Sequence, residues 1–459
     1  MTEARPGRRR GGIIGKVAGR FGWGLSDQAM SSLSNAAMSF YVARTLSPTE
    51  FGAFSIAYVT YSFALNASRG ISTEPLLVRF GHADVPAWRQ AVSRSTGTSV
   101  VAGVAMGAVA LIASFAMDGT LRMAFLALAI VLPGLMLQDS WRYAFFAVGR
   151  GHLSFLNDTV WTMAMVPAVV ALRVTHHRSV FWFILLWGAA ATIAACVGPL
   201  QARVLPKPWR AREWVIQHRD LGLRFLAENT SNAGAAQLRA YCIGGIAGLA
   251  AVGYVQAANL LMGPFMVVFA GISIVTVPEA ARVLRAAPWH LGRTCWLIGG
   301  GLAMAAALWG GALLIAIPRG LGALLLGSGL WPHAYLLVIP YTLSLMGSCV
   351  ADGLSAGLHA LSAARRSLRA MLVMSGLYLG LGIIGAYTDG AVGVVWGAAI
   401  ATWVGTAMWA YQFRTAINDH HRQYGNQRIR ISWQAKPADL PAGTRPTGAT
   451  RPTGATRNV

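Results

Sequence analysis

Residues 21–73 read FGWGLSDQAMSSLSNAAMSFYVARTLSPTEFGAFSIAYVTYSFALNASRGIST. The stretch holds two long, mostly apolar segments on either side of a short turn, LSPTE at residues 46–50. About 20 apolar residues form a helix that crosses a bilayer, so each segment is long enough. Both segments nevertheless carry amide and hydroxyl side chains, and the first carries the carboxylate of Asp27. The stretch therefore predicts two membrane helices that each have a polar face.

The composition of the whole chain agrees with a membrane protein. Of its 459 residues 55% are apolar and 12% are charged, and the mean hydropathy is +0.50. Soluble domains carry roughly 25% charged residues. The net charge of +22 does not indicate nucleic acid as a partner, because the basic residues lie between apolar segments and at the chain ends. The four cysteines are too far apart in sequence for a metal or redox pair, and we expect no cofactor.

Twelve apolar segments are long enough to cross the membrane. We therefore expect an all-α polytopic protein with about twelve transmembrane helices, and a short additional helix at 321–330. The twelve segments are 21–44, 50–72, 93–117, 121–148, 153–173, 179–204, 221–246, 249–277, 291–317, 333–360, 367–388 and 390–414.

The basic residues predict how these segments are oriented. If the N-terminus is cytoplasmic, 30 of the 38 basic residues fall on the cytoplasmic side and five on the outer side. This asymmetry places both termini in the cytoplasm. The excess of Arg, Ala and Gly is typical of a high-GC bacterium, so we expect a multi-pass protein of the bacterial cell (plasma) membrane.

The same segments suggest a domain organisation. We expect a basic N-terminal tail, a first six-helix bundle, a basic loop with two tryptophans, a second six-helix bundle and a disordered tail with two RPTGAT copies. The basic loop is expected to lie along the anionic inner leaflet. The corresponding ranges are 1–20, 21–204, 205–220, 221–414 and 415–459.

The two halves of the chain resemble each other weakly. A shift of 201 residues places Gly52 on Gly253 and Asp27 on Glu228. Because each half has six segments, both halves enter the membrane from the same side and form a parallel repeat. Transporters with such repeats commonly bind their substrate between the halves.

Polar side chains recur at helical spacing within several segments. A charge at mid-bilayer costs at least about 2.5–3.5 kcal/mol, so these faces must meet other helices or water. A structural alternative applies to each, since such residues often only join helices by hydrogen bonds. The candidate cavity residues are Arg69, Arg142, Arg239, Asn66, Gln256 and Asn259, and the candidate ion-coupling or charge-balancing residues are Asp27, Glu228, Asp139 and Asp352.

Two of these positions have further sequence support. A shift of 213 residues places Asp139 on Asp352, and Asp139 lies three residues before Arg142, with which it can form a structural ion pair.

A cavity lined by arginines with few acids attracts anions, and guanidinium groups bind phosphates through paired donors. This points to a phospholipid-type or polyprenyl-pyrophosphate substrate.

The opening stretch 21–73, its turn ARTLSPTEFGAFSIA at 43–57 and the echo IAGLAAVGYVQAANLLMGPF at 246–265 carry a family resemblance. They resemble the Wzx-type polysaccharide flippases of the multidrug/oligosaccharidyl-lipid/polysaccharide (MOP) exporter superfamily. The resemblance implies two bundles of the MATE/MOP type around a central cationic cavity, with Arg69 and Arg239 facing it. It also implies alternating access, and transfer of a lipid-linked oligosaccharide to the outer leaflet for cell-surface polysaccharide, together with polymerase and export proteins.

Three alternatives remain open. An ion-coupled small-molecule exporter of the MATE type would use Asp27 and Glu228 to carry protons or Na⁺. A lipid II flippase fits less well, because the first segment has no arginine before Arg44. A membrane glycosyltransferase or polymerase needs a large acidic outer loop, and the expected outer loops are short and poor in acids. The sequence thus favours a transporter over an enzyme.

Overall fold

The computed structural model describes residues 10–81, 83–176, 178–316 and 320–434. Over these residues the chain is helical and contains no strand. Two short 3-10 turns, η1 (Pro208–Arg210) and η2 (Pro288–His290), accompany the α-helices. The helices are α1 (Arg10–Thr45), α2 (Pro48–Ile71), α3 (Thr73–Phe80), α4 (Val85–Phe115), α5 (Gly119–Ala147), α6 (Gly151–Val174), α7 (Val180–Ala202), α8 (Ala211–Gln217), α9 (Arg219–Ala247), α10 (Leu249–Ala286), α11 (Leu291–Ala316), α12 (Leu321–Ala360) and α13 (Ala364–Gln434).

All twelve predicted membrane segments appear as helices. Ten of them correspond to α1, α2, α4 to α7 and α9 to α12. The last two form α13, whose backbone leaves the helical conformation at Asp389 and Gly390. The backbone of α12 is likewise broken at Gly327, close to the end of the short helix predicted at 321–330. The all-α polytopic fold is therefore confirmed.

Hydropathy alone finds fewer helices. Within the described ranges, eight helices are long and apolar enough to cross a membrane, and α1, α2 and α9 are not among them. These are three of the helices for which the sequence predicted polar faces. Since polar faces pack against protein or line cavities rather than meet lipid, the helices that shape the interior have the weakest hydropathy signal.

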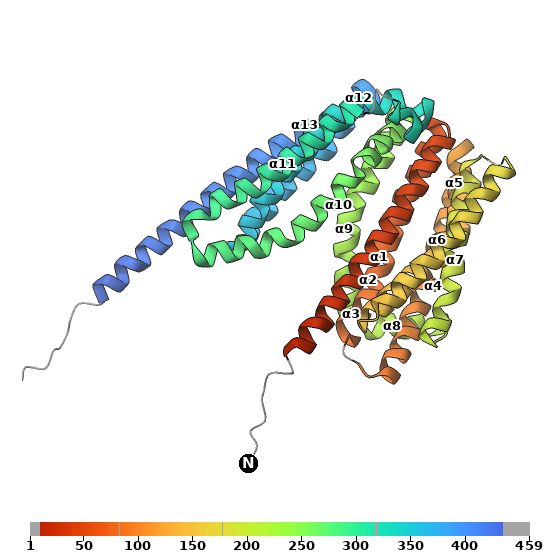
Figure 1. Cartoon of the computed structure of the whole chain (residues 1–459), viewed down its shortest axis with the longest axis horizontal. Helices are drawn as coiled ribbons and strands as arrows, with labels where there is room; N and C mark the ends of the chain where they lie inside the picture. The colour runs from red at the N-terminus through yellow and green to blue at the C-terminus, as the bar shows by residue number, and fades with distance from the viewer. Residues whose placement is uncertain (1–9, 82, 177, 317–319, 435–459) are drawn as a thin grey trace, which may run out of the picture.

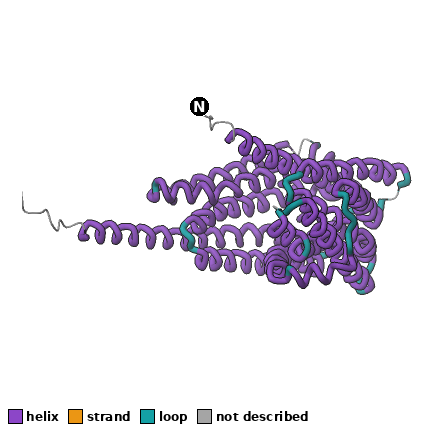
Figure 2. Tube along the Cα trace, turned by 90° about the horizontal axis from the view of Figure 1, so that it is seen from below, coloured by secondary structure: helices purple, strands orange, loops and turns teal. Residues whose placement is uncertain are grey.

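The helices form two bundles, α1–α7 and α9–α13 (Figure 1). The bundles lean together at one end, the closed end, and diverge toward the other, the open end (Figure 1). Both ends of the described chain, at Arg10 and Gln434, lie toward the open end. Figure 2 shows the helices linked by short loops, and the last part of α13 extending beyond its bundle.

Two glycines bring the bundles together at the closed end. A Cβ atom on Gly52 of α2 would overlap the carbonyl oxygen of Leu249, and one on Gly253 of α10 would overlap that of Pro48. The two glycines are 201 residues apart, and so are Pro48 and Leu249. The contact is therefore reciprocal, as expected when two halves of a repeat meet about a two-fold axis.

The turn before α2 fixes where this contact begins. The Ser47 hydroxyl accepts a hydrogen bond from the Glu50 backbone N–H at 3.3 Å, and the Glu50 carboxylate accepts one from the Ser47 N–H at 3.1 Å. This capping box starts a helix, and Pro48 suits its first position. The LSPTE turn thus sets the register of the polar face of α2.

The terminal helices are longer than predicted. α1 begins at Arg10, inside the predicted N-terminal tail, and α13 continues to Gln434, although disorder was expected from residue 415. Extending an existing helix costs little, and the first proline beyond α13 is Pro437. The RPTGAT copies lie outside the described residues.

The predicted basic loop between the bundles folds into η1 and α8. Trp209 is exposed, whereas Trp214 is buried, with its ring 4.1 Å from that of His218. Only one tryptophan of the expected pair is thus placed to meet a lipid surface.

Candidate functional site

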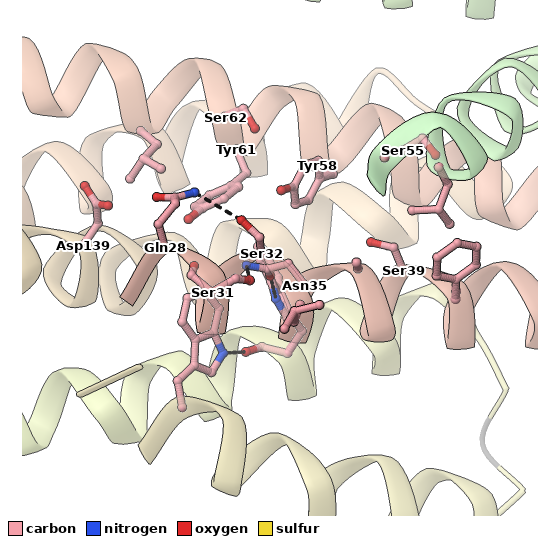
Figure 3. Close-up of a pocket in the computed structure, with 18 of the residues that line it drawn as sticks. Gln28, Ser31, Ser32, Asn35, Ser39, Ser55, Tyr58, Tyr61, Ser62 and Asp139 are labelled. Carbon is pink, nitrogen blue, oxygen red and sulfur yellow. Dashed lines mark hydrogen bonds between the residues drawn. The ribbon is translucent and has the colours of Figure 1, made fainter. Parts of the chain in front are cut away.

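A cavity of about 650 Å³, the central cavity, lies between α1, α2, α5, α6 and α7 on one side and α10 on the other (Figure 3). Its walls are rich in uncharged polar side chains and aromatic rings. Those from α1 include Gln28, Ser31, Ser32, Asn35 and Ser39, and those from α2 include Ser55, Tyr58, Tyr61 and Ser62.

Helical spacing explains these rows. Residues three or four apart share one face of a helix, and the polar residues of α1 and α2 follow this interval. The row on α2 continues to Asn66 and Arg69, which also line the cavity. Trp187 of α7 closes the wall. Its ring lies 5.1 Å from that of Tyr61, and its indole Nε1 donates to the side-chain oxygen Oδ1 of Asn35 at 3.4 Å.

The wall formed by α10 differs in character. It presents Gln256 followed by four apolar residues: Leu260, Gly263, Pro264 and Val267. The central cavity therefore has a polar wall from the first bundle and a largely apolar wall from the second.

The two seams between the bundles also differ. α2 packs against α9 along much of its length, whereas α1 touches α10 at few positions. The repeat relates α1 to α9 and α2 to α10, so the α1–α10 seam is the counterpart of the α2–α9 seam. Leu33 and Val267 line the central cavity from the two sides of the α1–α10 seam, and both are exposed.

The arginines at the base of the central cavity are paired with acids. Arg69 donates two hydrogen bonds to Asp139, from Nε to Oδ2 at 2.8 Å and from Nη2 to Oδ1 at 2.6 Å. The expected partner of Asp139, Arg142, lies farther away, at 3.8 Å. The preferred pair joins α2 to α5 because the bidentate geometry is available only across the helices.

Arg142 binds two other carboxylates. Its Nη2 donates to Asp27 Oδ2 at 2.7 Å, and its Nε lies 3.4 Å from Asp158 Oδ2. Asp27 and Asp158 are buried, and Gln138 donates a further hydrogen bond to Asp158 at 2.8 Å. Three acids thus surround two arginines, and the base of the cavity is less cationic than expected.

A second cavity of about 550 Å³, the C-terminal cavity, lies among α9, α10, α12 and α13, with Ser55 and Val59 of α2 completing its wall. It contains Arg239, whose Nη1 donates to the hydroxyl of Tyr378 and whose Cζ lies 4.2 Å from the centre of the Tyr378 ring. Asn259 lines this cavity and accepts a hydrogen bond from Tyr341 at 2.8 Å. Gln256 lines both cavities.

No family model matches the chain, and no curated protein matches its sequence. Several solved structures do match. An inward-facing conformation of a multidrug resistance MATE family transporter of the MOP superfamily aligns with a TM-score of 0.65 at 14% identity, covering 85% of this chain and 96% of that one. The lipid II flippase MurJ, in an inward closed conformation, aligns with a TM-score of 0.62 at 11% identity, covering 91% and 93%.

The chain has a MATE-type transporter fold. An outward-facing MATE structure of the same superfamily aligns less well, with a TM-score of 0.52 over 86% of this chain and 94% of that one, also at 14% identity. The arrangement of the two bundles therefore resembles the inward-facing form of the fold more than the outward-facing form.

Two of the predicted acids, Glu228 and Asp352, line neither cavity. Glu228, expected to face inward as the counterpart of Asp27, is exposed and lines neither cavity. Its neighbour Asn229 faces α2 instead, and donates to the Asn66 carbonyl at 3.1 Å and to Glu74 at 2.9 Å. At this level of α9 it is thus Asn229, and not Glu228, that makes the contact with α2.

Asp352 lies on α12 and accepts a hydrogen bond from Ser273 of α10 at 2.9 Å. Its repeat counterpart Asp139 lies on α5 and contacts α2. Each aspartate thus bonds to the second membrane helix of its own bundle, but only Asp139 meets an arginine there.

Asp158 was not among the predicted site residues. The available signal was an Asn157–Asp158 pair inside the apolar segment 153–173, because an acid within a membrane span is itself a candidate functional residue.

Proposed function

We propose that the protein is a flippase that moves a polyprenyl-pyrophosphate-linked oligosaccharide from the inner to the outer leaflet of a bacterial plasma membrane. It acts by alternating access, with both termini in the cytoplasm and the open end facing the cytoplasm. The fold, which MATE transporters and a lipid II flippase share, supports a transporter of the MOP type. The positive-inside asymmetry of the loops supports the orientation.

The observation that carries the proposal is the central cavity with its open seam. Its polar wall offers hydroxyl, amide and aromatic groups, which suit a polyhydroxylated head group. The α1–α10 seam joins this cavity to the membrane beside the apolar wall of α10. A head group can therefore enter from the leaflet while its hydrocarbon chain stays in lipid.

The paired acids and arginines have a role in this mechanism. Asp27 and Asp139 balance the charges of Arg142 and Arg69, so the base of the cavity holds together without bound substrate. The third acid, Asp158, leaves the cluster with an excess negative charge when all its members are ionised. Coupling to a proton or cation gradient through these acids would supply the driving force.

A second candidate function is ion-coupled export of small molecules. The likeness to a multidrug MATE transporter and the excess acid in the Arg142 cluster favour it. In that case the substrate would be a cation rather than a lipid-linked sugar.

Mass spectrometry of polyprenyl-linked oligosaccharides in cells with and without the gene separates the two functions. A flippase predicts that loss of the gene makes one complete lipid-linked repeat unit accumulate, and that the restored gene clears it. Unchanged lipid-linked sugars, together with increased sensitivity to cationic drugs, would instead identify an exporter.

A further inference from the structure

Arg239 is the one arginine of the three within the membrane segments that meets no acid in the described part of the chain. Arg69 and Arg142 each form an ion pair shorter than 3 Å, whereas no carboxylate of the described residues lies within 4.0 Å of Arg239. A charge within the bilayer costs at least about 2.5–3.5 kcal/mol. Arg239 therefore lacks the counter-charge that Arg69 and Arg142 have.

The surroundings of Arg239 prepare it for an anion. Tyr378 holds the guanidinium by a hydrogen bond and by its ring face, while the Nε–H group is buried and has no partner among the described residues. The wall of this cavity is largely apolar, with Ile243 and Met374 among its members and a few polar groups such as Asn259. In such low-dielectric surroundings, attraction between opposite charges is stronger than in water.

Arg69 is poorly suited to the same task. Both of its hydrogen bonds to Asp139 would have to break for it to bind a phosphate through paired donors. That exchange would leave a buried carboxylate without its partner, which is costly. Of the two arginines that the resemblance implies face the substrate cavity, Arg239 is therefore the better suited to bind a phosphate.

We infer that the C-terminal cavity is the anion site, where Arg239 binds the pyrophosphate of the lipid-linked substrate. The inference rests on the proposed function, since that function supplies the ligand. Ser55 and Gln256 line both cavities, so a ligand held at Arg239 can extend into the central cavity. There the sugar meets the polar wall of α1 and α2. The hydrocarbon chain of the ligand follows the apolar wall of α10 from Leu260 to Val267 and leaves through the α1–α10 seam.

Binding of farnesyl pyrophosphate to the full-length protein in lipid nanodiscs tests the site. Arg239→Gln should weaken binding at least about tenfold, because a charge-assisted contact is lost. Arg239→Lys keeps the charge without paired donors and should bind with intermediate affinity. The control is Arg282→Gln, which changes an exposed arginine that lines neither cavity and should bind within about threefold of wild type.

Several results would overturn the inference. One is wild-type binding by Arg239→Gln with loss of binding in the double variant Arg69→Gln with Asp139→Asn, which would move the anion to the central cavity. Equal binding of inorganic pyrophosphate would show that the apolar chain contributes nothing. Displacement by phosphatidylglycerol at equal concentration would assign the site to ordinary phospholipid.

Mass spectrometry of lipid-linked oligosaccharides in cells distinguishes a wrong location of the anion site from a wrong proposed function. If Arg239→Gln binds normally while cells lacking the gene still accumulate a lipid-linked oligosaccharide, only the location of the site is wrong. If the wild type binds no farnesyl pyrophosphate and nothing accumulates, the flippase itself is wrong.

Discussion

The side chains of Arg69 and Asp139 join α2 to α5 through two parallel hydrogen bonds at the base of the central cavity. The Asp139 carboxylate is almost fully buried. In such a pair each charge offsets the desolvation of the other, so removal of one partner costs more than removal of both.

Asp139→Asn should therefore destabilise the protein by about 3–5 kcal/mol, since it leaves the Arg69 charge uncompensated. Adding Arg69→Gln should restore much of the loss. Thermal unfolding of the purified variants, followed by tryptophan fluorescence, compares them. If Asp139→Asn unfolds at the same temperature as wild type, the ion pair contributes little to the stability of the protein.

His218 precedes α9 and links it to α3. Its Nδ1 accepts a hydrogen bond from Arg79 Nη1 at 2.7 Å, and Arg79 also pairs with Asp220 at 2.6 Å. Burial, and then the charge of Arg79, lower the pKa of His218 from its usual value of about 6.5. The folded protein thus favours the neutral ring.

A lowered histidine pKa means that the unfolded chain takes up the proton first as pH falls. Stability from this site is present above about pH 6.5 and is lost as pH falls toward the folded pKa. The unfolding temperature of wild type should drop more between pH 7.5 and 5.5 than that of His218→Gln. Equal drops in both proteins would exclude His218 as the cause.

Among the elements, α2 and α10 meet more closely than any side chain would allow. Gly52 and Gly253 each lie against the backbone of the opposite helix, and the contact closes the end away from the chain termini. Under the proposed alternating access this end must open and close, and the glycine contact then determines whether it can close.

Gly52→Val should hold the closed end apart and favour the outward-open form. A cysteine placed at Ser39 in the central cavity should then react faster with a membrane-impermeant maleimide added outside the cell, once the native cysteines are replaced. Gly245→Val is the matched control, because a Cβ at Gly245 meets open space. Equal labelling of Gly52→Val and the control would remove these glycines from the gate.

The sequence located the elements better than it located their faces and ends. All twelve segments chosen for their length and apolar content lie in helices, although α1, α2 and α9 are less apolar than the other spans. The sequence did not show that α13 continues to Gln434, because charges and amides do not stop a helix. On α9 it expected Glu228 to face inward, whereas its neighbour Asn229 makes the contact with α2, because the spacing of a few polar residues does not fix which side chain meets the next helix.

At the scale of the whole molecule, the bundles keep one seam closed and leave the other nearly open. The α2–α9 seam is bridged by hydrogen bonds, such as that between Thr60 and Tyr241 at 2.8 Å, whereas α1 and α10 touch little. The two seams are equivalent by the repeat, so under the proposed function the head group would pass at the α1–α10 seam, where the helices touch least.

A linker between α1 and α10 should therefore stop transport. Cysteines at Leu33 and Val267, joined by a short bifunctional maleimide, should abolish flipping, because the seam can no longer admit the head group. Each single-cysteine variant treated alike should remain active. Full activity of the linked protein would place the route elsewhere.

The candidate site was only partly predictable at this scale. Helical spacing brought Asn66 and Arg69 to one face, and both line the central cavity. Partner choice across helices depends on how the bundle packs, so the Arg69–Asp139 and Arg142–Asp27 pairs could not be derived from spacing. The place of Arg239 in a separate cavity also depends on how the helices pack, so spacing could not predict it.

The most direct test is flipping by the purified protein in proteoliposomes that contain the lipid-linked oligosaccharide extracted from cells lacking the gene. Sugar reaching the outer leaflet is measured by lectin binding to sealed vesicles. We predict transfer with wild type, little with Arg239→Gln, and none in protein-free vesicles. A folded wild-type protein that leaves the sugar on its original side would contradict the account.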